Sequence, residues 1–354
     1  MRLSITVPVD DPRSAGACFA ELEAAGYDGA FSFESSHDPF LPLAAAAATT
    51  TRLRLGTAVA IGLARNPMVL AETGNDLQTM TGGRFVLGLG SQIRPHIERR
   101  FSESWSSPAR RMGELVAAIK AIWTAWDRGV PLDFRGEFYR HTLMTPAFDP
   151  GPNPFGPPPV LIGGVGPEMV ATAGEVADGL VVHPFTTRRS FEALTLPALD
   201  RGLARAGRRR DALDVMWVTT VVTWSDEAQR RAAMASARAQ FAFYGSTPAY
   251  RATLAMHGWD DRQPELNRLS KAGRWDEMAD LIPDELVETV AVVGPRDEIA
   301  SRLVERAAGL AEHVGLVNNR NPDPTHFADI VAEVRRATIG PTSSGRGPAI
   351  NEAG

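Results

Sequence analysis

A glycine turn, a run of apolar residues and a second glycine loop follow one another in the stretch Gly82-Gly83-Arg84-Phe85-Val86-Leu87-Gly88-Leu89-Gly90-Ser91-Gln92. Residues 84–89 predict a β-strand, because apolar residues follow one another between the two glycine segments. A strand that is apolar on both faces is typical of a parallel sheet covered by helices. The stretch therefore indicates a fold in which strands alternate with helices.

The same rhythm continues on both sides of this stretch. Further strands are predicted at residues 3–7, 29–33, 53–61, 159–162, 179–183, 215–223 and 313–318. Helical patterns separate many of them, for example at residues 41–50, 69–80, 108–126 and 166–177. Strands in this order predict a (β/α)8 TIM barrel, an α/β fold that often runs to about 250 residues or more as one domain.

We expect a single catalytic domain over residues 1–340 of the 354-residue chain. A long helical insertion is predicted at about residues 226–284, between the seventh and eighth strands, where it would cap one end of the barrel. A hairpin is predicted around residues 132–141. Residues 341–354 are rich in glycine, serine and proline and are predicted to be disordered.

Composition and charge exclude several classes of function. The net charge is −5 and charges of both signs are mixed along the chain, which argues against nucleic acid or an anionic membrane as the main partner. The single cysteine, Cys18, excludes a disulfide within the chain and a cysteine-based metal site. The histidines show neither HxH nor HExxH spacing, so no metal site is predicted. Without a signal peptide or a long apolar run, the protein is expected to be cytoplasmic.

In this fold, functional residues follow the carboxyl ends of the strands. Glu34 and His37 follow the second strand, His96 follows the fourth, and His183 ends the sixth. Each histidine either transfers protons or is a hydrogen-bonded loop residue, and Glu34 is either a catalytic acid or an acceptor that supports the site. Because all four are expected on one edge, they are the candidate catalytic residues.

Two glycine loops are expected at the same edge. The loop at residues 163–166 precedes a helix that Pro167 would start, which suits either a phosphate group or a purely steric tight turn. The loop at residues 88–92 lacks the GxxxxGK pattern of a P-loop and the first-strand position of a dinucleotide-binding fingerprint. Its small residues suit a close approach of the backbone to a flat ring.

Several motifs in combination resemble the bacterial luciferase-like superfamily over roughly residues 1–335. They are Leu55-Gly56-Thr57-Ala58-Val59, Arg65-Asn66-Pro67, Leu70-Ala71-Glu72, Gly82-Gly83-Arg84-Phe85, Leu87-Gly88-Leu89-Gly90-Ser91, Pro159-Val160-Leu161-Ile162-Gly163-Gly164 and Glu175-Val176-Ala177-Asp178-Gly179. Within the superfamily, the chain is similar to the branch that uses coenzyme F420, a deazaflavin, for hydride transfer. Segments 33–40, 88–92 and 242–250 resemble one subgroup of that branch.

This resemblance implies a cofactor site at the strand ends and a homodimer. A non-prolyl cis peptide is expected at Ala58-Val59, where it would bulge the third strand against the deazaflavin ring. Gly90 and Ser91 are expected near the ring or its side chain, and the cofactor phosphate near residues 165–168 at a helix start. The predicted cofactor-binding residues are Thr57, Ala58, Val59, Gly90, Ser91, Gln92, Gly164, Val165, Gly166 and Glu168.

The chain departs from the sugar-phosphate dehydrogenases of this branch. Those enzymes carry an Asp-His pair after the second strand, where this chain has Glu34-Ser35. Their glutamate after the fourth strand falls at Ile93, and the lysine that holds the substrate phosphate falls near Thr186. A sugar 6-phosphate substrate is therefore not expected.

The leading hypothesis is F420-dependent hydride transfer on an unidentified small organic substrate. One alternative is a monooxygenase that uses reduced FMN and O2, because the same barrel serves both chemistries. A second alternative is a non-catalytic cofactor-binding protein, which the missing histidine after the second strand leaves open.

Overall fold

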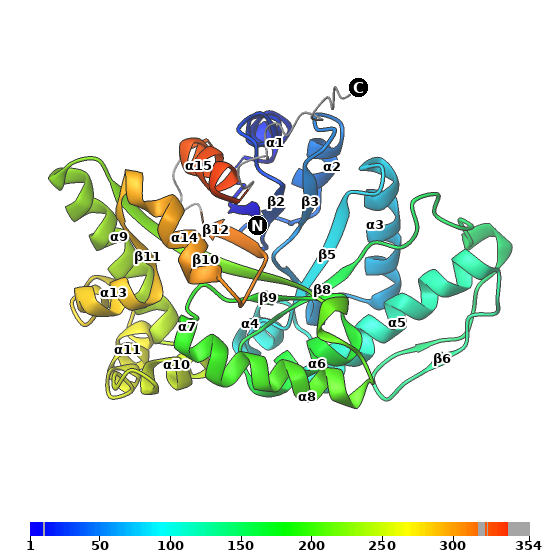
Figure 1. Ribbon diagram of the computed structural model, residues 1–354. Coiled ribbons are helices and arrows are strands. Elements are labelled where there is room, and N and C mark those ends of the chain that lie inside the picture. The colour runs from blue at the N-terminus through cyan, green and yellow to red at the C-terminus, as the bar shows by residue number, and fades with distance from the viewer. Residues whose placement is uncertain (10, 318–322, 324, 339–354) are drawn as a thin grey trace, which may run out of the picture.

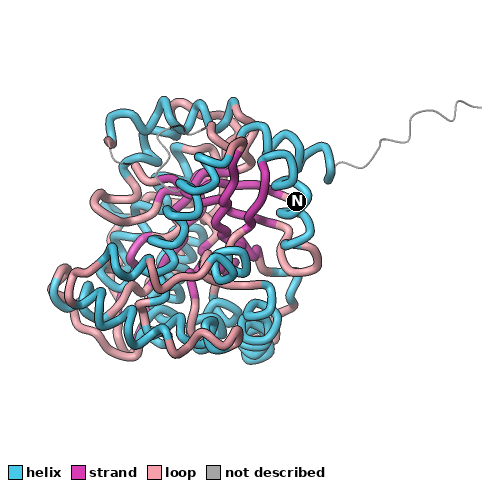
Figure 2. Tube along the Cα trace, turned by 90° about the vertical axis from the view of Figure 1, so that its left-hand side faces the viewer, coloured by secondary structure: helices cyan, strands magenta, loops and turns pink. Residues whose placement is uncertain are grey.

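The computed structural model describes residues 1–9, 11–317, 323 and 325–338 of the chain. In this part, parallel strands close into a barrel, and helices surround the strands at the centre of the molecule (Figure 2). The barrel strands, in order around the ring, are β1 Arg2–Val7, β2 Gly29–Ser32, β3 Arg54–Thr57, β5 Phe85–Gly90, β8 Val160–Gly164, β9 Gly179–Val182, β10 Asp214–Trp224 and β12 His313–Val317. The predicted (β/α)8 barrel is confirmed.

Pairing between the first and last strands closes the ring. β12 pairs in parallel with both β1 and β10, and β10 also pairs with β9. Ile5 aligns with Leu316 on one side and with Ala30 on the other, and all three belong to the core between the strands and the helices. The register therefore places apolar side chains of neighbouring strands on the same face.

The third predicted strand, residues 53–61, is two strands in the structure. β3 ends at Thr57, and β4 Ala60–Ile61 follows after a cis peptide bond between Ala58 and Val59. The expected cis peptide is thus confirmed. The eighth strand, predicted to end at residue 318, is described as far as Val317, and residue 318 lies outside the described residues.

Helices on the outside of the barrel connect the strands (Figure 1). They are α1 Ala15–Ala24, α2 Leu41–Ala47, α3 Pro67–Met80, α4 Arg94–Arg99, α5 Pro108–Arg128, α6 Pro167–Val176, α7 Arg188–Ser190, α8 Leu196–Arg205, α14 Ile299–Ala307 and α15 Ala328–Thr338. α3 begins where Asn66 accepts a hydrogen bond from Met68 N–H and Pro67 occupies the first helical position. α2 ends at Ala47, before the predicted residue 50, and the hydroxyls of Thr49 and Thr50 bond back to the Ala46 carbonyl.

The helical insertion rises from the carboxyl end of β10. Its helices are α9 Glu227–Gly245, α10 Arg251–Ala255, α11 Arg262–Lys271, α12 Trp275–Ala279 and α13 Asp284–Val290, which gather at the left of Figure 1. The last residues of β10 continue past the ring, where Val221 to Trp224 pair with β11 Val292–Pro295. Asp226 caps α9 by accepting from Gln229 N–H at 2.8 Å. The predicted hairpin, β6 Phe134–Arg135 and β7 Arg140–His141, lies on the opposite side of the barrel (right in Figure 1).

Three apolar clusters hold these parts together. The largest lies between the outer faces of the strands and the surrounding helices. A second fills the insertion and includes Phe185 from the loop after β9 and Val222 from β10, so the insertion packs directly on the strand ends. The third fills the inside of the barrel and includes Phe31, Val181 and Met216.

A partly buried cation joins the insertion to the barrel. The Arg306 guanidinium donates hydrogen bonds to the carbonyl oxygens of Thr186 at 3.0 Å and Val290 at 2.5 Å. It also lies over the Trp217 ring, 4.7 Å from the centroid. Burial lowers the pKa of Arg306 to about 10, which leaves it charged at neutral pH. The residue therefore ties the last insertion helix to the loop after β9.

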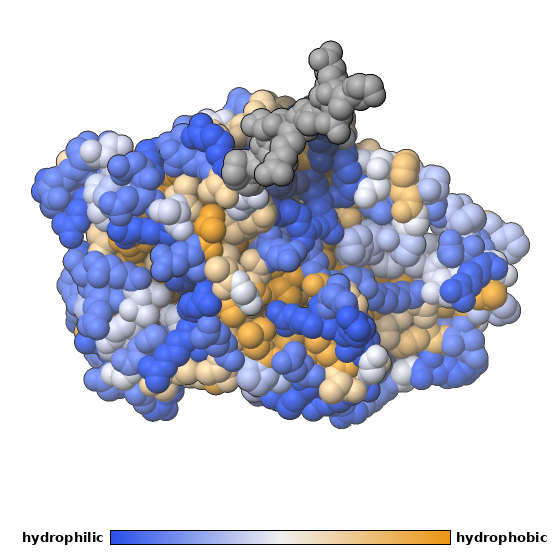
Figure 3. Space-filling model, in the orientation of Figure 1, coloured by the Kyte–Doolittle hydropathy of each residue, from blue (hydrophilic) through white to orange (hydrophobic). Residues whose placement is uncertain are grey.

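Hydrophilic side chains cover most of the face shown in Figure 3, with a smaller hydrophobic area below its centre. No helix in the described part of the chain combines the length and apolar character that a membrane span requires. The predicted disordered tail, residues 341–354, lies outside the described residues.

Candidate functional site

The carboxyl ends of the barrel strands form a mouth with an apolar floor. The inside of the barrel is closed by Phe31, Val86, Leu161, Val181, Met216 and Val218. Ala58, Val59 and Val317 are partly buried and pack on this layer. Because they come from the ends of β3 and β12, they form the upper layer of the barrel interior. Such a floor suits a flat apolar surface better than a charged group.

Glycines in β5 and β8 make room for the bulge after β3. A Cβ added to Gly90 would lie 2.6 Å from Val59 Cγ2, and one added to Gly163 would lie 3.0 Å from Val59 Cγ1. A Cβ on Gly88 would lie 1.8 Å from the carbonyl oxygen of Thr57. For the loop at residues 88–92, the sequence predicts that small residues let the backbone approach a flat ring. In the structure, the neighbours they accommodate are Thr57 and Val59.

Thr57 fixes this close approach. Its hydroxyl donates to the Gly88 carbonyl oxygen at 2.6 Å and accepts from Gly88 N–H at 2.9 Å. The residue is 0% exposed. Its side chain thus supports the backbone that carries Ala58 and Val59.

Glu34 braces the same bulge from the side of β2. Its backbone N–H donates to the Val59 carbonyl oxygen at 3.1 Å, and its carboxylate accepts from Ile61 N–H at 2.8 Å. The carboxylate is 5% exposed and forms an ion pair with Arg65, whose guanidinium also reaches Asp38 at 3.1 Å. The acceptor role, one of the two alternatives for Glu34, is the one this geometry supports.

His37 and His96 lie on exposed segments of the rim. His37 belongs to the loop after β2, and His96 to α4 after β5. These segments touch, because the Arg100 guanidinium donates to the Ser35 carbonyl oxygen at 2.6 Å. Across the described residues, no hydrogen bond, ion pair or ring contact joins any two of the four candidate catalytic side chains. The structure gives each of them a separate environment.

His183 has the most specialised environment of the four. Its ring stacks on Tyr250 with centroids 4.6 Å apart and meets Tyr244 edge-on at 4.7 Å. The Nδ1 atom accepts a hydrogen bond from Phe185 N–H at 3.1 Å. Burial lowers the pKa of His183 to about 3, so the imidazole is neutral at physiological pH.

The loop after β5 turns sharply at Gln92. This residue adopts a left-handed φ of 57°, and its side-chain Oε1 accepts from Ile93 N–H at 3.0 Å. The Ser91 hydroxyl donates to the Gln92 carbonyl oxygen at 3.1 Å. Both residues keep part of their surface exposed at the mouth.

The glycine loop after β8 leads into α6 with an open helix end. Gly166 is the N-cap of α6, makes no side-chain cap, and has no atom within 4 Å of the position that a Cβ would take. Gly164 is buried against Val170, and Val165 is partly exposed. The Glu168 carboxylate turns to Arg201 and Arg205, at 3.5 and 3.6 Å. Backbone N–H groups of the first turn are therefore available to an anion.

Three residues of this region carry no sequence motif that indicates their role. Tyr244 and Tyr250 lie in the quoted segment 242–250, but only the folded insertion brings them to His183. Arg65 lies in the quoted motif Arg65-Asn66-Pro67, and its pairing with Glu34 spans 31 positions. A lone arginine after the third strand, facing an acidic residue after the second, is the signal that could have indicated this pair.

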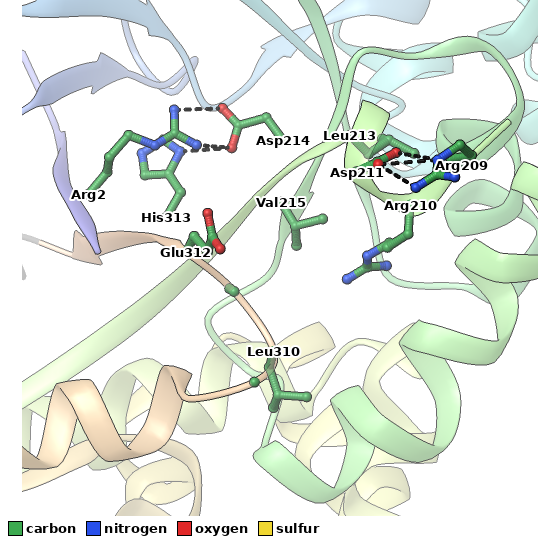
Figure 4. A pocket seen from close by; sticks show the side chains of 12 residues that line it. Arg2, Arg209, Arg210, Asp211, Leu213, Asp214, Val215, Leu310, Glu312 and His313 are labelled. Carbon is green, nitrogen blue, oxygen red and sulfur yellow. Dashed lines mark hydrogen bonds and ion pairs between the residues drawn. The ribbon is translucent and has the colours of Figure 1, made fainter.

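A pocket of about 770 Å³ lies at the opposite end of the barrel (Figure 4). It opens where β1, β10 and β12 begin, and Arg2 pairs there with Asp214 and Arg209 with Asp211. In this fold that end serves stability, whereas sites form at the carboxyl ends of the strands. Among the described residues, no group of three or more histidine, cysteine, aspartate or glutamate side chains is arranged to hold a metal ion.

Barrel, bulge and mouth together define a known class of oxidoreductase. The chain belongs to the luciferase-like monooxygenase family, whose pattern matches residues 2–313. An uncharacterized protein of Mycobacterium tuberculosis is 52% identical over 314 residues, which cover 89% of this chain and 92% of that protein. An F420-dependent glucose-6-phosphate dehydrogenase of Nakamurella multipartita is 32% identical over 253 residues, 70% of each chain.

The fold also matches a solved structure at low sequence identity. The coenzyme F420 dependent tetrahydromethanopterin reductase from Methanopyrus kandleri superposes with a TM-score of 0.77 at 21% identity, covering 93% of this chain and 96% of that one. At this identity the likeness establishes the shared barrel fold.

Proposed function

We propose that this chain is a coenzyme F420-dependent oxidoreductase that binds the deazaflavin across the mouth of the barrel. The observation that carries this proposal is the pairing of an apolar floor at Ala58, Val59 and Val317 with an open helix end at Gly166. A flat ring and a phosphate are the two parts that such a pair of surfaces would hold. Relatives that use F420 support the same reading.

The floor fits the ring of a deazaflavin. It is apolar, it lies on a closed interior, and Thr57 and Glu34 fix its backbone. A rigid apolar surface holds a flat ring with little ordering cost. Ala58 and Val59 would lie against the ring, and Gly90, Ser91 and Gln92 would border it.

The end of α6 fits the phosphate of the cofactor. A helix N-terminus carries a partial positive charge, and a glycine N-cap leaves its N–H groups uncovered. Gly164, Val165 and Gly166 would hold the phosphate with backbone groups. Glu168 would contribute its backbone N–H and not its carboxylate, because the carboxylate pairs with Arg201 and Arg205.

When bound, a deazaflavin supplies or accepts a hydride and reacts poorly with oxygen. The residues of this chain would bind and orient the two reactants. The apolar floor would keep water from the ring, and the Glu34–Arg65 pair would hold the bulge in position. Homodimer assembly and a cytoplasmic location remain predictions from the sequence.

The family description also favours a second candidate, a monooxygenase that uses reduced FMN and O2. Fluorescence titration of the purified protein with F420 and FMN in parallel separates the two. We expect saturable binding of F420 and no comparable binding of FMN. Micromolar FMN affinity without F420 binding would overturn the proposal in favour of the monooxygenase.

A further inference from the structure

Three rings from separate segments meet at one point of the mouth. His183 follows β9, Tyr244 lies on α9, and Tyr250 ends a short 3-10 helix at Pro248–Tyr250. His183 and Tyr250 stack at an interplanar angle of 29°, and Tyr244 meets His183 at 78°. We call these three residues the aromatic clamp. The insertion thus delivers two of its members to a residue of the barrel.

The register of β9 places the clamp on the side of the apolar floor. Successive side chains of a strand alternate between its two faces, so residues two apart point the same way. Val181 of β9 belongs to the cluster that fills the barrel interior. His183 comes directly after β9 ends at Val182, so the same alternation, carried one residue past the strand, places it on the interior side.

The hydrogen bond at Nδ1 fixes which ring nitrogen carries the proton. Nδ1 accepts from Phe185 N–H, so a neutral His183 must carry its hydrogen on Nε2. Nε2 makes no hydrogen bond to any residue that the structure describes. The clamp thus presents one uncharged N–H donor without a protein acceptor.

The surroundings of this donor are also uncharged. Tyr244 and Tyr250 have pKa values raised by burial, which keeps both phenols neutral, and the Tyr244 hydroxyl accepts from the Gln240 amide at 3.0 Å. Burial is the one cause that lowers the His183 pKa, so no charged side chain of the described residues acts strongly on this ring. An anion bound here would lose its water without gaining a counter-charge, which is unfavourable.

We propose that the substrate of the reaction is an uncharged, largely apolar carbonyl compound whose oxygen accepts a hydrogen bond from His183 Nε2 while its body packs on Tyr244 and Tyr250. This inference rests on the proposed function, which supplies the cofactor. It assigns His183 the role of orienting the substrate oxygen, and it excludes phosphorylated and carboxylate substrates at this point of the mouth.

Histidine side-chain NMR tests the proposal without relying on turnover. Protein labelled with ¹⁵N-histidine is observed at pH 7, and the His183 signal is the one missing from His183→Phe. We expect a neutral ring with hydrogen on Nε2. Acetophenone or cyclohexanone should shift this signal, whereas benzoate should not. A charged ring, hydrogen on Nδ1, an equal response to benzoate, or a response to neither ketone would each overturn the inference.

Matched variants separate hydrogen bonding from ring stacking. His183→Phe keeps an aromatic ring and removes the donor, so acetophenone should bind roughly 3- to 10-fold more weakly. Phe243→Ala removes an exposed ring next to Tyr244, outside the clamp, and should change affinity by less than about twofold. Unchanged ketone affinity in His183→Phe would contradict the donor role.

Binding of F420 is read in the same samples from its own fluorescence. If F420 does not bind, the proposed function fails whatever the histidine signal shows. If F420 binds and the His183 signal is unaffected by the ketones, the inference about the substrate fails alone.

Discussion

Replacement of Gly88 by alanine tests whether the bulge after β3 depends on the glycines of β5. The new Cβ would lie 1.8 Å from the Thr57 carbonyl oxygen, so this backbone would have to move by more than ~1 Å to restore ordinary contact. That shift would also disturb the two hydrogen bonds between the Thr57 hydroxyl and Gly88. Overpacking of this kind costs about 1–3 kcal/mol, and each lost hydrogen bond about 0.5–1.5 kcal/mol.

Alanine leaves the unfolded chain less conformational entropy than glycine does, and this difference offsets roughly 0.5–1 kcal/mol of the loss. We therefore expect Gly88→Ala to lower the free energy of unfolding by about 3 kcal/mol, which is a shift of roughly 1 M in the urea midpoint. Tryptophan fluorescence during urea titration measures it. Gly166→Ala is the matched control, because its Cβ enters open space at a φ of −70°, and it should cost less than about 1 kcal/mol. Equal midpoints for Gly88→Ala and the wild type would refute the packing argument.

Three further predictions concern charged and titratable groups. Glu34→Gln should lower the free energy of unfolding in urea by about 1–3 kcal/mol, because Arg65 loses a buried partner. The control Glu98→Gln, in an exposed ion pair, should lower it by less than about 0.5 kcal/mol, and equal effects of the two variants would contradict this prediction. Arg306→Met should lower the free energy of unfolding by about 2–4 kcal/mol, because it leaves the carbonyls of Thr186 and Val290 unpaired. An unchanged free energy of unfolding would show that other contacts hold the insertion on the barrel. The pKa of His183 is lowered to about 3, so its contribution to stability is present above its unfolded pKa of about 6.5 and is lost as the pH falls. Urea unfolding of His183→Gln should therefore depend less on pH between about 7 and 4 than that of the wild type, and parallel profiles would contradict the lowered pKa.

The barrel could be predicted because local sequence patterns indicate its strands. Apolar runs such as residues 84–89, each bounded by glycine or proline, fix where strands begin and end. The family resemblance located the cis peptide at Ala58-Val59. The helix at residues 94–99 escaped prediction, because it is too short to show a helical period.

The contacts of the site were harder to foresee, because they join residues that are distant in sequence. Nothing local in the chain indicates that Tyr250 stacks on His183, since the packing of the whole insertion sets that contact. The small residues of β5 indicate a close approach of the backbone, and in the structure the bulge after β3 occupies the space beside Gly88 and Gly90. Such a use of glycine depends on the partner strand, which a single segment does not reveal.

The affinity of F420 for two substitutions of Gly166 tests the central claim most directly. Asp and Asn are comparably good N-cap residues, so Gly166→Asp and Gly166→Asn should both leave α6 folded. They differ by one negative charge at the proposed phosphate position. We predict that F420, followed by its fluorescence, binds Gly166→Asp at least about 10-fold more weakly than Gly166→Asn. Equal affinities for the two variants would place the phosphate elsewhere and contradict the account of this mouth as a deazaflavin site.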